Sequence, residues 1–305
     1  RGSRKQGARV MRIGSFLPGA TEMAYLLGLG DHLVGVSHEC DFPEDARSKP
    51  CLTRSILPDN LPSAEIDRIV RARLRAHQSL YEIDQRLLAR LAPDLVLTQD
   101  LCEVCAITKD DVLAAVGRLP RQPALLSIAP SCLDDIYRDL AALGAASGTE
   151  DRAADAVADL RRRVDRVDAL TAGARRPRVF CMEWLDPPMP GGHWVPEQVR
   201  LAGGDDIFGR QGRPSRRISW EEVVRSRPEV VVLMPCGFPI ERTLAELPAL
   251  TGLPGWADLP AVRSGRVFAV DGPAYFNRCG PRVVDGLELL VEVFHPDRCV
   301  GPAPA

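Results

Sequence analysis

Residues 87–102, LLARLAPDLVLTQDLC, combine a helical pattern, a proline followed by an acidic residue, an apolar run and a cysteine. The same order returns in residues 222–238, EVVRSRPEVVVLMPCGF. In each stretch the proline ends the helix, because it lacks a backbone N–H and clashes with the preceding turn. The short apolar run that follows is typical of a buried strand. The shared plan predicts two similar α/β lobes.

Strand and helix patterns alternate on both sides of these two stretches. In the first half, strands are expected over 12–18, 33–37, 94–99 and 124–128, and helices over 20–30, 80–91 and 110–119. The second half repeats the alternation from residue 178 and ends in a helix over 281–294. Such alternation is the signature of a mostly parallel sheet covered by helices.

The segment between the two halves is different. Residues 133–171 are rich in Ala, Leu, Arg and Asp, with one weak point near Gly148, and predict a long helical connector with small lobe motions. The expected fold class is therefore α/β, with two Rossmann-like lobes of mostly parallel sheets joined by a single long connector helix. The expected divisions are an upstream extension or expression remnant (1–10), an N-terminal lobe (11–132), the connector (133–172), a C-terminal lobe (173–298) and a tail (299–305).

Composition narrows the possible functions. The 305 residues carry 39 basic and 41 acidic side chains, so no excess of charge favours nucleic acid or an anionic membrane. No apolar run is long enough for a transmembrane helix, and no signal peptide precedes Met11, the expected native start. Nine cysteines, an odd number, favour a reducing cytosol.

The loops after the strands hold the candidate binding residues, because ligands of open α/β sheets bind beyond the carboxyl ends of the strands. Small residues let a ligand approach the backbone, aromatic rings supply apolar walls, and amide or guanidinium groups donate hydrogen bonds. We interpret Trp184, Cys132, Cys181 and Cys299 as structural, Cys279 as packing or function, and Arg282 as a surface charge. The predicted ligand-binding residues are Pro18, Gly19, Ala20, Thr21, Tyr81, Cys102, Cys105, His193, Trp194, Cys236, Phe238, Phe276, Asn277 and Arg278.

The C-x-x-C pair of Cys102 and Cys105 admits three interpretations. With His38 and Cys40 it would form a Cys/His zinc or other metal-binding or metal-sensing site. By itself, placed between a strand and a helix, it would serve a thiol oxidoreductase. In a cleft it would contact a soft ligand.

Several motifs, in order, resemble the class III periplasmic substrate-binding proteins. They include RIGSFLPGATEMAYLLGLGDHLVGVS (12–37), LLARLAPDLVL (87–97), PEQVRLAGGDDIF (196–208) and LPAVRSGRVFAVDG (259–272), so the resemblance covers residues 12–296. Within that family the chain looks most like the vitamin B12-binding proteins. The resemblance implies a non-catalytic carrier of cobalamin, haem or a siderophore, an extracytoplasmic location, and an ABC permease partner. It also implies docking carboxylates, which by position are Glu82 or Asp84 and Glu222.

Residues and resemblance together predict a binding protein, not an enzyme, since no Ser/His/Asp order or phosphate-binding glycine loop is present. The expected ligand is a corrinoid such as cobalamin, or a related metal macrocycle, held between the lobes. A thiolate of Cys102, Cys105 or Cys236, or the imidazole of His193, would supply axial ligation to its metal. Zinc binding and thiol oxidoreduction remain the alternatives.

Overall fold

Two α/β lobes lie one above the other in the computed structural model, which describes residues 10–58, 60–100 and 107–298. The sheet of the N-terminal lobe has the order β2 (Leu33–Gly35), β1 (Ile13–Ser15), β5 (Leu95–Gln99) and β6 (Ala124–Ile128), with every pair parallel. The central strands β1 and β5 are buried, as in a parallel sheet covered on both faces, whereas the edge strand β6 is partly exposed. The covering helices are α1 (Pro18–Leu26), α3 (Gln85–Leu91) and α4 (Lys109–Val116).

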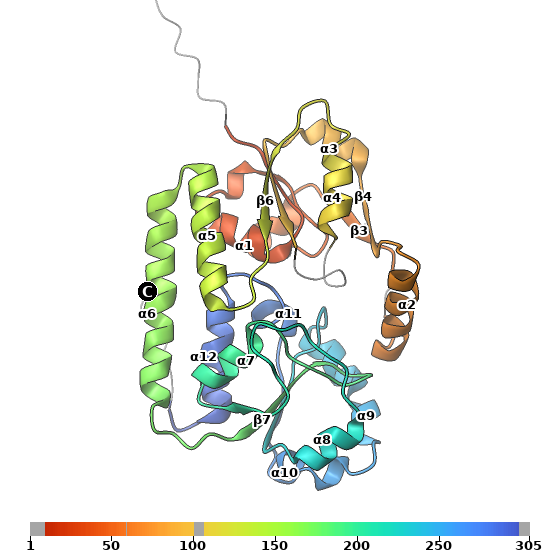
Figure 1. Cartoon of the computed structure of the whole chain (residues 1–305), viewed down its shortest axis with the longest axis vertical. Coiled ribbons are helices and arrows are strands. Elements are labelled where there is room, and N and C mark those ends of the chain that lie inside the picture. The colour runs from red at the N-terminus through yellow and green to blue at the C-terminus, as the bar shows by residue number, and fades with distance from the viewer. Residues whose placement is uncertain (1–9, 59, 101–106, 299–305) are drawn as a thin grey trace, which may run out of the picture.

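The segment expected as one helix over residues 80–91 is divided. Its first part is β4 (Tyr81–Ile83), which pairs antiparallel with β3 (Thr53–Ser55). The helix α3 begins only after Asp84, whose carboxylate accepts a hydrogen bond from the backbone N–H of Leu87. This N-cap ends the strand and starts the helix. An amphipathic helix that the sequence interpretation missed, α2 (Ser63–Arg75), stands beside the lobe (Figure 1).

The C-terminal lobe repeats the plan. Its sheet has the order β11 (Val267–Ala269), β10 (Val230–Leu233), β7 (Arg178–Trp184) and β8 (Met189–Pro190), and β9 (Asp205–Asp206) also pairs with β7. All pairs are parallel except β7–β8. The surrounding helices are α7 (Val195–Leu201), α8 (Trp220–Ser226), α9 (Ile240–Thr251), α10 (Pro260–Arg263), α11 (Gly272–Tyr275) and α12 (Val283–Phe294). Short 3₁₀ helices occupy Gly30–His32, Glu44–Ser48 and Trp256–Asp258.

The connector consists of two helices, so the expectation of a single one was wrong in this detail. Helix α5 (Leu133–Ser147) ends at Gly148, which has φ +69° and reverses the chain, and α6 (Glu150–Thr171) runs back beside it. Glycine suits this place because the left-handed region costs it little. Only α6 passes along both lobes in Figure 1, and it packs on α7 and α12.

One hydrophobic core joins the lobes. It contains β1 and α1 residues such as Ile13 and Met23, connector residues such as Leu140 and Leu160, and α12 residues such as Leu287. A smaller core lies on the outer face of each sheet. It surrounds Phe16 in the N-terminal lobe and Phe180 in the C-terminal lobe. Within the described ranges, no helix combines the length and the apolar character needed to cross a bilayer.

Candidate functional site: the cleft between the lobes

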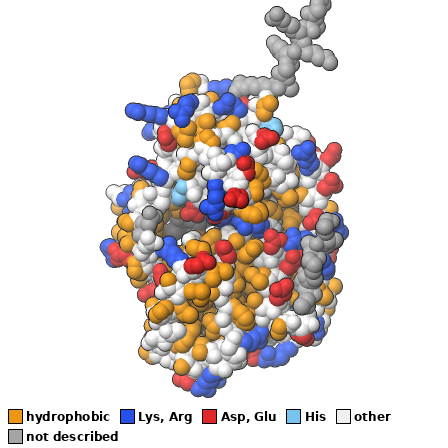
Figure 2. Space-filling model, turned by 180° about the vertical axis from the view of Figure 1, so that it is seen from behind, with side chains coloured by type: hydrophobic (Ala, Val, Ile, Leu, Met, Phe, Trp, Pro, Cys, Tyr) orange, Lys and Arg blue, Asp and Glu red, His pale blue; other side chains and the backbone are white. Residues whose placement is uncertain are grey.

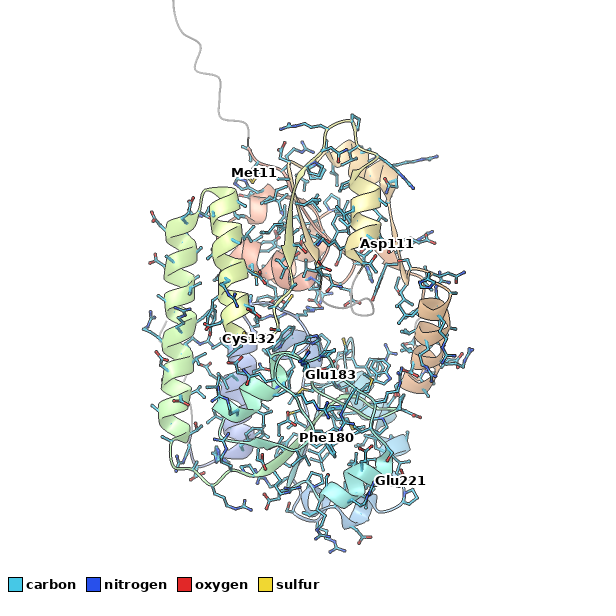
Figure 3. All side chains as sticks on the ribbon, in the orientation of Figure 1. Met11, Asp111, Cys132, Phe180, Glu183 and Glu221 are labelled. Carbon is cyan, nitrogen blue, oxygen red and sulfur yellow. The ribbon has the colours of Figure 1, made fainter. Side chains whose placement is uncertain are left out.

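The carboxyl ends of the parallel strands in the two lobes face each other. Glu183 at the end of β7 lies nearer to the N-terminal lobe than Phe180 of the same strand (Figure 3). Viewed from behind, the molecular surface is hollowed between the lobes (Figure 2). A cleft at this place receives the loops that follow the strands of both sheets.

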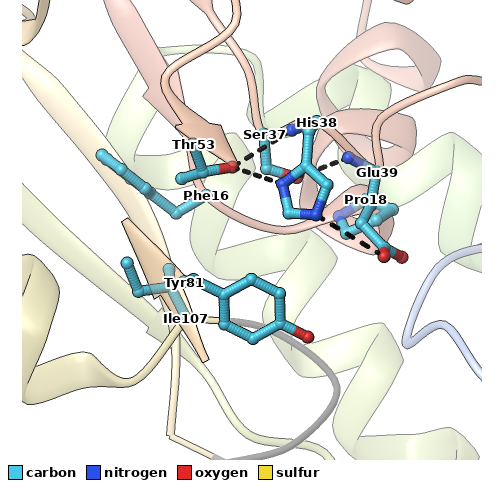
Figure 4. A pocket seen from close by; sticks show the side chains of 8 residues that line it. All are labelled: Phe16, Pro18, Ser37, His38, Glu39, Thr53, Tyr81 and Ile107. Atoms are coloured by element: carbon cyan, nitrogen blue, oxygen red, sulfur yellow. Dashed lines mark hydrogen bonds and ion pairs between the residues drawn. The ribbon is translucent and has the colours of Figure 1, made fainter. Parts of the chain in front are cut away.

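On the N-terminal wall, loops after β1, β2 and β5 meet the antiparallel pair β3–β4 around a small pocket (Figure 4). Its volume of about 10 Å³ leaves room for about one water molecule. A macrocycle is far larger, so this pocket forms part of a wall and does not enclose such a ligand. The lining residues are Phe16, Pro18, Ser37, His38, Glu39, Thr53, Tyr81 and Ile107.

His38 is the most constrained side chain of this pocket. Its Nδ1 lies 2.8 Å from Thr53 Oγ1, which also accepts the His38 backbone N–H at 3.1 Å. Its Nε2 lies 3.7 Å from a carboxylate oxygen of Glu39, and the His38 side chain is 24% exposed. Burial lowers the pKa of His38, while the Glu39 charge opposes that shift. The imidazole is therefore neutral at pH 7.

Tyr81, a predicted ligand residue, lies beside His38 with ring centroids 5.6 Å apart. Cys40, which was expected to join His38 at a metal, points elsewhere. Its sulfur lies 3.1 Å from Thr21 Oγ1 and 3.3 Å from Ser37 Oγ, and burial raises the pKa of this thiol. A buried neutral thiol held by hydroxyl groups is a poor metal ligand, because the thiolate is the ligand form.

On the C-terminal wall, Glu183 is held by two hydrogen bonds that the sequence interpretation missed. One carboxylate oxygen accepts from Ser215 Oγ at 2.7 Å and the other from the Gly192 backbone N–H at 3.0 Å. Burial raises the pKa of Glu183, although both hydrogen bonds oppose the shift. The backbone of Cys236, a predicted ligand residue, donates to the Glu183 carbonyl at 3.0 Å. The sequence does contain a signal for Glu183, because it is an acidic residue near the end of an apolar strand.

The aromatic planes expected in the second lobe are buried. Trp194 is 3% exposed, and its indole N–H donates to the Phe276 carbonyl at 2.9 Å. Phe238 and Phe276 are each 1% exposed, so none of the three rings offers a free face. His193 is partly exposed at a positive φ of 52°, and burial lowers its pKa. Of this set only His193 is partly exposed.

The two predicted polar residues have hydrogen-bond partners within the protein. Asn277 donates to the Met234 carbonyl at 3.3 Å, within the C-terminal lobe. Arg278 donates to the Asp41 carboxylate and, at 2.9 Å, to the Glu39 carbonyl, both across the lobe boundary. Burial disfavours the charged form of Asp41, but the hydrogen bond and charge of Arg278 prevail and lower its pKa.

Arg282, which we expected as a surface charge, belongs to the same boundary. Its guanidinium donates to both oxygens of Glu22 on α1, at 2.7 and 3.1 Å. The Glu22 side chain is only 2% exposed and that of Arg282 only 14%. We call Glu22, Asp41, Arg278 and Arg282 the interlobe ion cluster.

The turn at Pro18 to Thr21 packs on this boundary. All four residues are buried, and only Pro18 is among those that line the pocket. A Cβ at Gly19 would lie 2.7 Å from the Cys279 carbonyl carbon, so the backbones of the two lobes touch there. Thr21 lies inside α1 and does not cap it, and its hydroxyl donates to Ser15 Oγ at 2.9 Å.

A second bridge lies on the α2 side of the cleft. The Ser63 backbone N–H donates to both oxygens of Glu246 on α9, at 3.0 and 3.1 Å. Arg242 of the same helix donates to the Leu61 carbonyl at 2.8 Å, and Arg217 pairs with Asp67 of α2. Contacts thus join the lobes on two sides.

The remaining predicted residues are accounted for as follows. Glu82 pairs with Arg54, Asp84 caps α3, and Glu222 forms a capping box with Ser219. Cys102 and Cys105 lie outside the described residues. Within the described ranges, no disulfide joins the cysteines and no group of three or more His, Cys, Asp or Glu side chains could hold a metal ion. Zinc therefore has no support there.

Two similar α/β lobes, bridged by helices and facing each other across a cleft, define a two-lobed ligand-binding protein. Residues 16–274 match the periplasmic binding protein family, and the chain belongs to that family. The expected resemblance is confirmed.

Individual relatives agree with this placement. The vitamin B12-binding protein of Vibrio cholerae is 27% identical over 290 residues, covering 92% of this chain and 87% of its own. The crystal structure of that species' periplasmic vitamin B12 binding protein has a TM-score of 0.66 at 26% identity and covers 93% and 96% of the two chains. A periplasmic heme binding protein from Pseudomonas aeruginosa has a TM-score of 0.72 at 20% identity and covers 94% of each, which shows the shared fold.

Proposed function

We propose that the protein is a non-catalytic carrier that binds a corrinoid, such as cobalamin, in the cleft between its lobes. The observation that carries the proposal is the 27% identity to a vitamin B12-binding protein along 92% of the chain. The identity runs through both lobes, so it includes both walls of the cleft. The alternative of zinc binding is not part of the proposal.

The chemistry of the two walls supports a corrinoid. The half-buried ring of Tyr81 offers apolar surface to a flat ring, with Phe16 and Pro18 packed behind it, and His38 offers a neutral nitrogen. On the opposite wall, the carboxyl group of Glu183 has further lone pairs that accept from the amide N–H groups at a corrin's edge. The predicted contacts of Cys102, Cys105 and Cys236 with the ligand belong to this proposal as well.

The second half of the proposal is that the protein acts outside the cytoplasm and delivers its ligand to an ABC permease. Family membership supports it, because the family is one of periplasmic binding proteins. Glu82 on the first lobe and Glu222 on the second are proposed as docking carboxylates, with Asp84 as the alternative to Glu82. Each is exposed enough to meet an arginine of a partner, although each has a local hydrogen bond. Charge reversal of Glu82 and Glu222 should abolish stimulation of permease ATPase activity while ligand affinity stays unchanged.

An absorbance titration with aquacobalamin tests the carrier function, with hemin as a parallel ligand. Hemin is included because His38 and Tyr81, both side chains of types that ligate haem iron, line one pocket. The proposal predicts saturating one-to-one binding of aquacobalamin that is tighter than that of hemin. Tighter hemin binding would move the assignment to haem. Binding of neither would reject the macrocycle function.

A double variant, Cys102→Ser with Cys105→Ser, tests the cysteine contacts in the same titration. Direct thiolate ligation to cobalt predicts that the double variant loses the shift of the corrin bands. Retention of the full shift and affinity would show that the two thiols do not ligate the metal. The matched control is Cys51→Ser, which changes an exposed cysteine that does not line the N-terminal pocket.

A further inference from the structure

His38 differs from the other histidines in how its ring is held. His32 and His295 each have a ring nitrogen at a main-chain carbonyl, of Met11 and Gly203. His77 is exposed and lies outside the pocket lining. Only His38 has one ring nitrogen on a neighbouring hydroxyl within the pocket of the N-terminal wall, as far as the described residues go.

We propose that His38 Nε2 is the axial nitrogen ligand that the N-terminal wall supplies to the metal of the bound macrocycle. The inference rests on the proposed function and names the contact that determines which metal-bearing ligand the cleft prefers. In the exchange, the Co–O bond to a bound water breaks and a Co–N bond to Nε2 forms. The water leaves with both its protons, and cobalt keeps its oxidation state.

The geometry around the ring supports this role. Thr53 Oγ1 lies 2.8 Å from Nδ1, and Thr53 is 6% exposed in β3, which pairs with β4. When Nδ1 donates its proton to this hydroxyl, the lone pair is on Nε2, as in metal-ligating histidines whose other nitrogen is hydrogen-bonded.

The charged groups around His38 favour a cationic metal there. Glu39 Oε1 is 3.7 Å from Nε2, and among the described residues its carboxylate is the one acidic group lining the pocket. Asp41, two residues further on, is neutralised by Arg278. The Tyr81 ring, with its centroid 5.6 Å away, limits rotation of the imidazole from the other side. Figure 4 shows His38 between Glu39 and Tyr81.

His193 on the opposite wall is the competing histidine. No hydrogen bond to its ring is recorded among the described residues, and its ring lies 5.7 Å from the largely buried ring of Trp194. If His193 were the ligand, no neighbouring group would determine which of its ring nitrogens carries the proton. His193 thus provides a matched control on the same cleft.

Electron paramagnetic resonance of bound cob(II)inamide, the corrin without its nucleotide base, is the deciding experiment. Since that probe brings no nitrogen base of its own, a triplet splitting from one ¹⁴N on the cobalt lines must come from the protein. We expect the triplet in the wild type and in His193→Ala, and its loss in His38→Ala. The affinity for diaquacobinamide should fall about tenfold in His38→Ala, and added imidazole should restore the triplet.

Other results would overturn the assignment. A triplet that persists in His38→Ala places the nitrogen elsewhere. Cobinamide binding without any triplet in the wild type leaves the carrier function intact and removes the ligand role of His38. Absence of cobinamide and aquacobalamin binding rejects both. If His38→Ala does not fold, His38→Gln replaces it, because its amide can still meet Thr53 and cannot give the imidazole triplet.

Thr53 is a positioning residue in this scheme. Thr53→Val keeps the shape of the side chain and removes the hydroxyl partner of Nδ1. We expect the ¹⁴N triplet to remain, with its coupling changed, and cobinamide to dissociate faster. A spectrum identical to that of the wild type would show that the hydroxyl does not orient the ring.

Discussion

The guanidinium of Arg282 in the C-terminal lobe donates to both carboxylate oxygens of Glu22 in the N-terminal lobe, at 2.7 and 3.1 Å. Both side chains are nearly out of contact with solvent. Arg278 lies 3.9 Å from the same carboxylate, so the interlobe ion cluster depends on the two lobes staying together. Removal of Glu22 leaves the Arg282 guanidinium without its hydrogen-bonded carboxylate.

Glu22→Ala should therefore lower the free energy of unfolding by about 3–5 kcal/mol, as expected when one partner of a buried pair is lost. Denaturant titration followed by circular dichroism measures this. The matched control is Glu65→Ala, which removes the exposed partner of Arg68 on α2 and should change the free energy of unfolding little. If the two variants lost the same free energy of unfolding, burial of the Glu22–Arg282 pair would not explain its contribution to stability.

Gly19→Ala should force the lobes apart at α1. The added Cβ would lie 2.7 Å from the Cys279 carbonyl carbon and 2.9 Å from the Gly280 nitrogen, both backbone atoms that cannot rotate away. We expect a loss of about 1–3 kcal/mol from overpacking, seen as a lower Tm. Gly14→Ala is the control, because its Cβ would meet nothing closer than 3.6 Å. An unchanged Tm in Gly19→Ala would show that the backbone contact between Gly19 and Cys279 can accommodate a methyl group.

Asp139→Asn tests a pH dependence. Burial raises the pKa of Asp139 to about 6, and its buried Oδ2 has no hydrogen-bond partner among the described residues. The folded protein therefore keeps a proton that the unfolded chain loses, and this stabilisation, present below about pH 4, disappears as the pH rises through about 6. Asparagine imitates the protonated acid, so the variant should gain up to about 1 kcal/mol over the wild type between pH 4 and 7, after allowance for solvent screening.

Unfolding curves at pH 4, 5, 6 and 7 check the Asp139 prediction. The difference between variant and wild type should grow with pH. A constant difference would mean that this carboxyl group titrates normally. Asp134→Asn on the same helix is the control, since it is exposed and already paired with Arg161 at the surface.

Glu246→Ala should weaken the contact of α2 with the C-terminal lobe, which Arg217 and Arg242 still maintain. Two hydrogen bonds from Ser63 to this carboxylate are lost, and local opening becomes cheaper by about 1 kcal/mol. Amide exchange over residues 63–75 should be about fivefold faster, with the rest of the chain unchanged. Glu241→Ala, an exposed change on the same helix, should leave the exchange of α2 at the wild-type rate. Uniform acceleration would indicate global destabilisation instead.

Local patterns predicted the sheets because each strand carries its own signal. Pro93 and Pro228 each precede a short apolar run, and the structure has β5 and β10 directly after them. The division of residues 80–91 was not predicted, because Leu80, Ile83 and Leu87 also fit a helical face. What separates the strand from the helix is the Asp84 cap, a single hydrogen bond.

The cleft residues were harder to predict because burial depends on the other lobe. Trp194 follows two glycines and has the sequence context of an exposed loop, yet the Phe276 carbonyl, 82 residues away, accepts its indole N–H. Arg282 has the sequence context of a surface residue, yet its partner Glu22 is 260 residues distant. The type of a residue and its neighbours in the chain carry no information about such long-range pairs. His38 was recognised as a ligand type, but its partner Thr53 was not.

The shared core has a thermodynamic consequence. Since side chains from both sheets and from α6 pack in one cluster, neither lobe has a complete interior of its own. The lobes should melt together, so calorimetry should show a single endotherm with a van't Hoff enthalpy equal to the calorimetric one. An isolated N-terminal half would expose the apolar residues that now contact α12. The chain is two-lobed in shape and a single cooperative unit in folding.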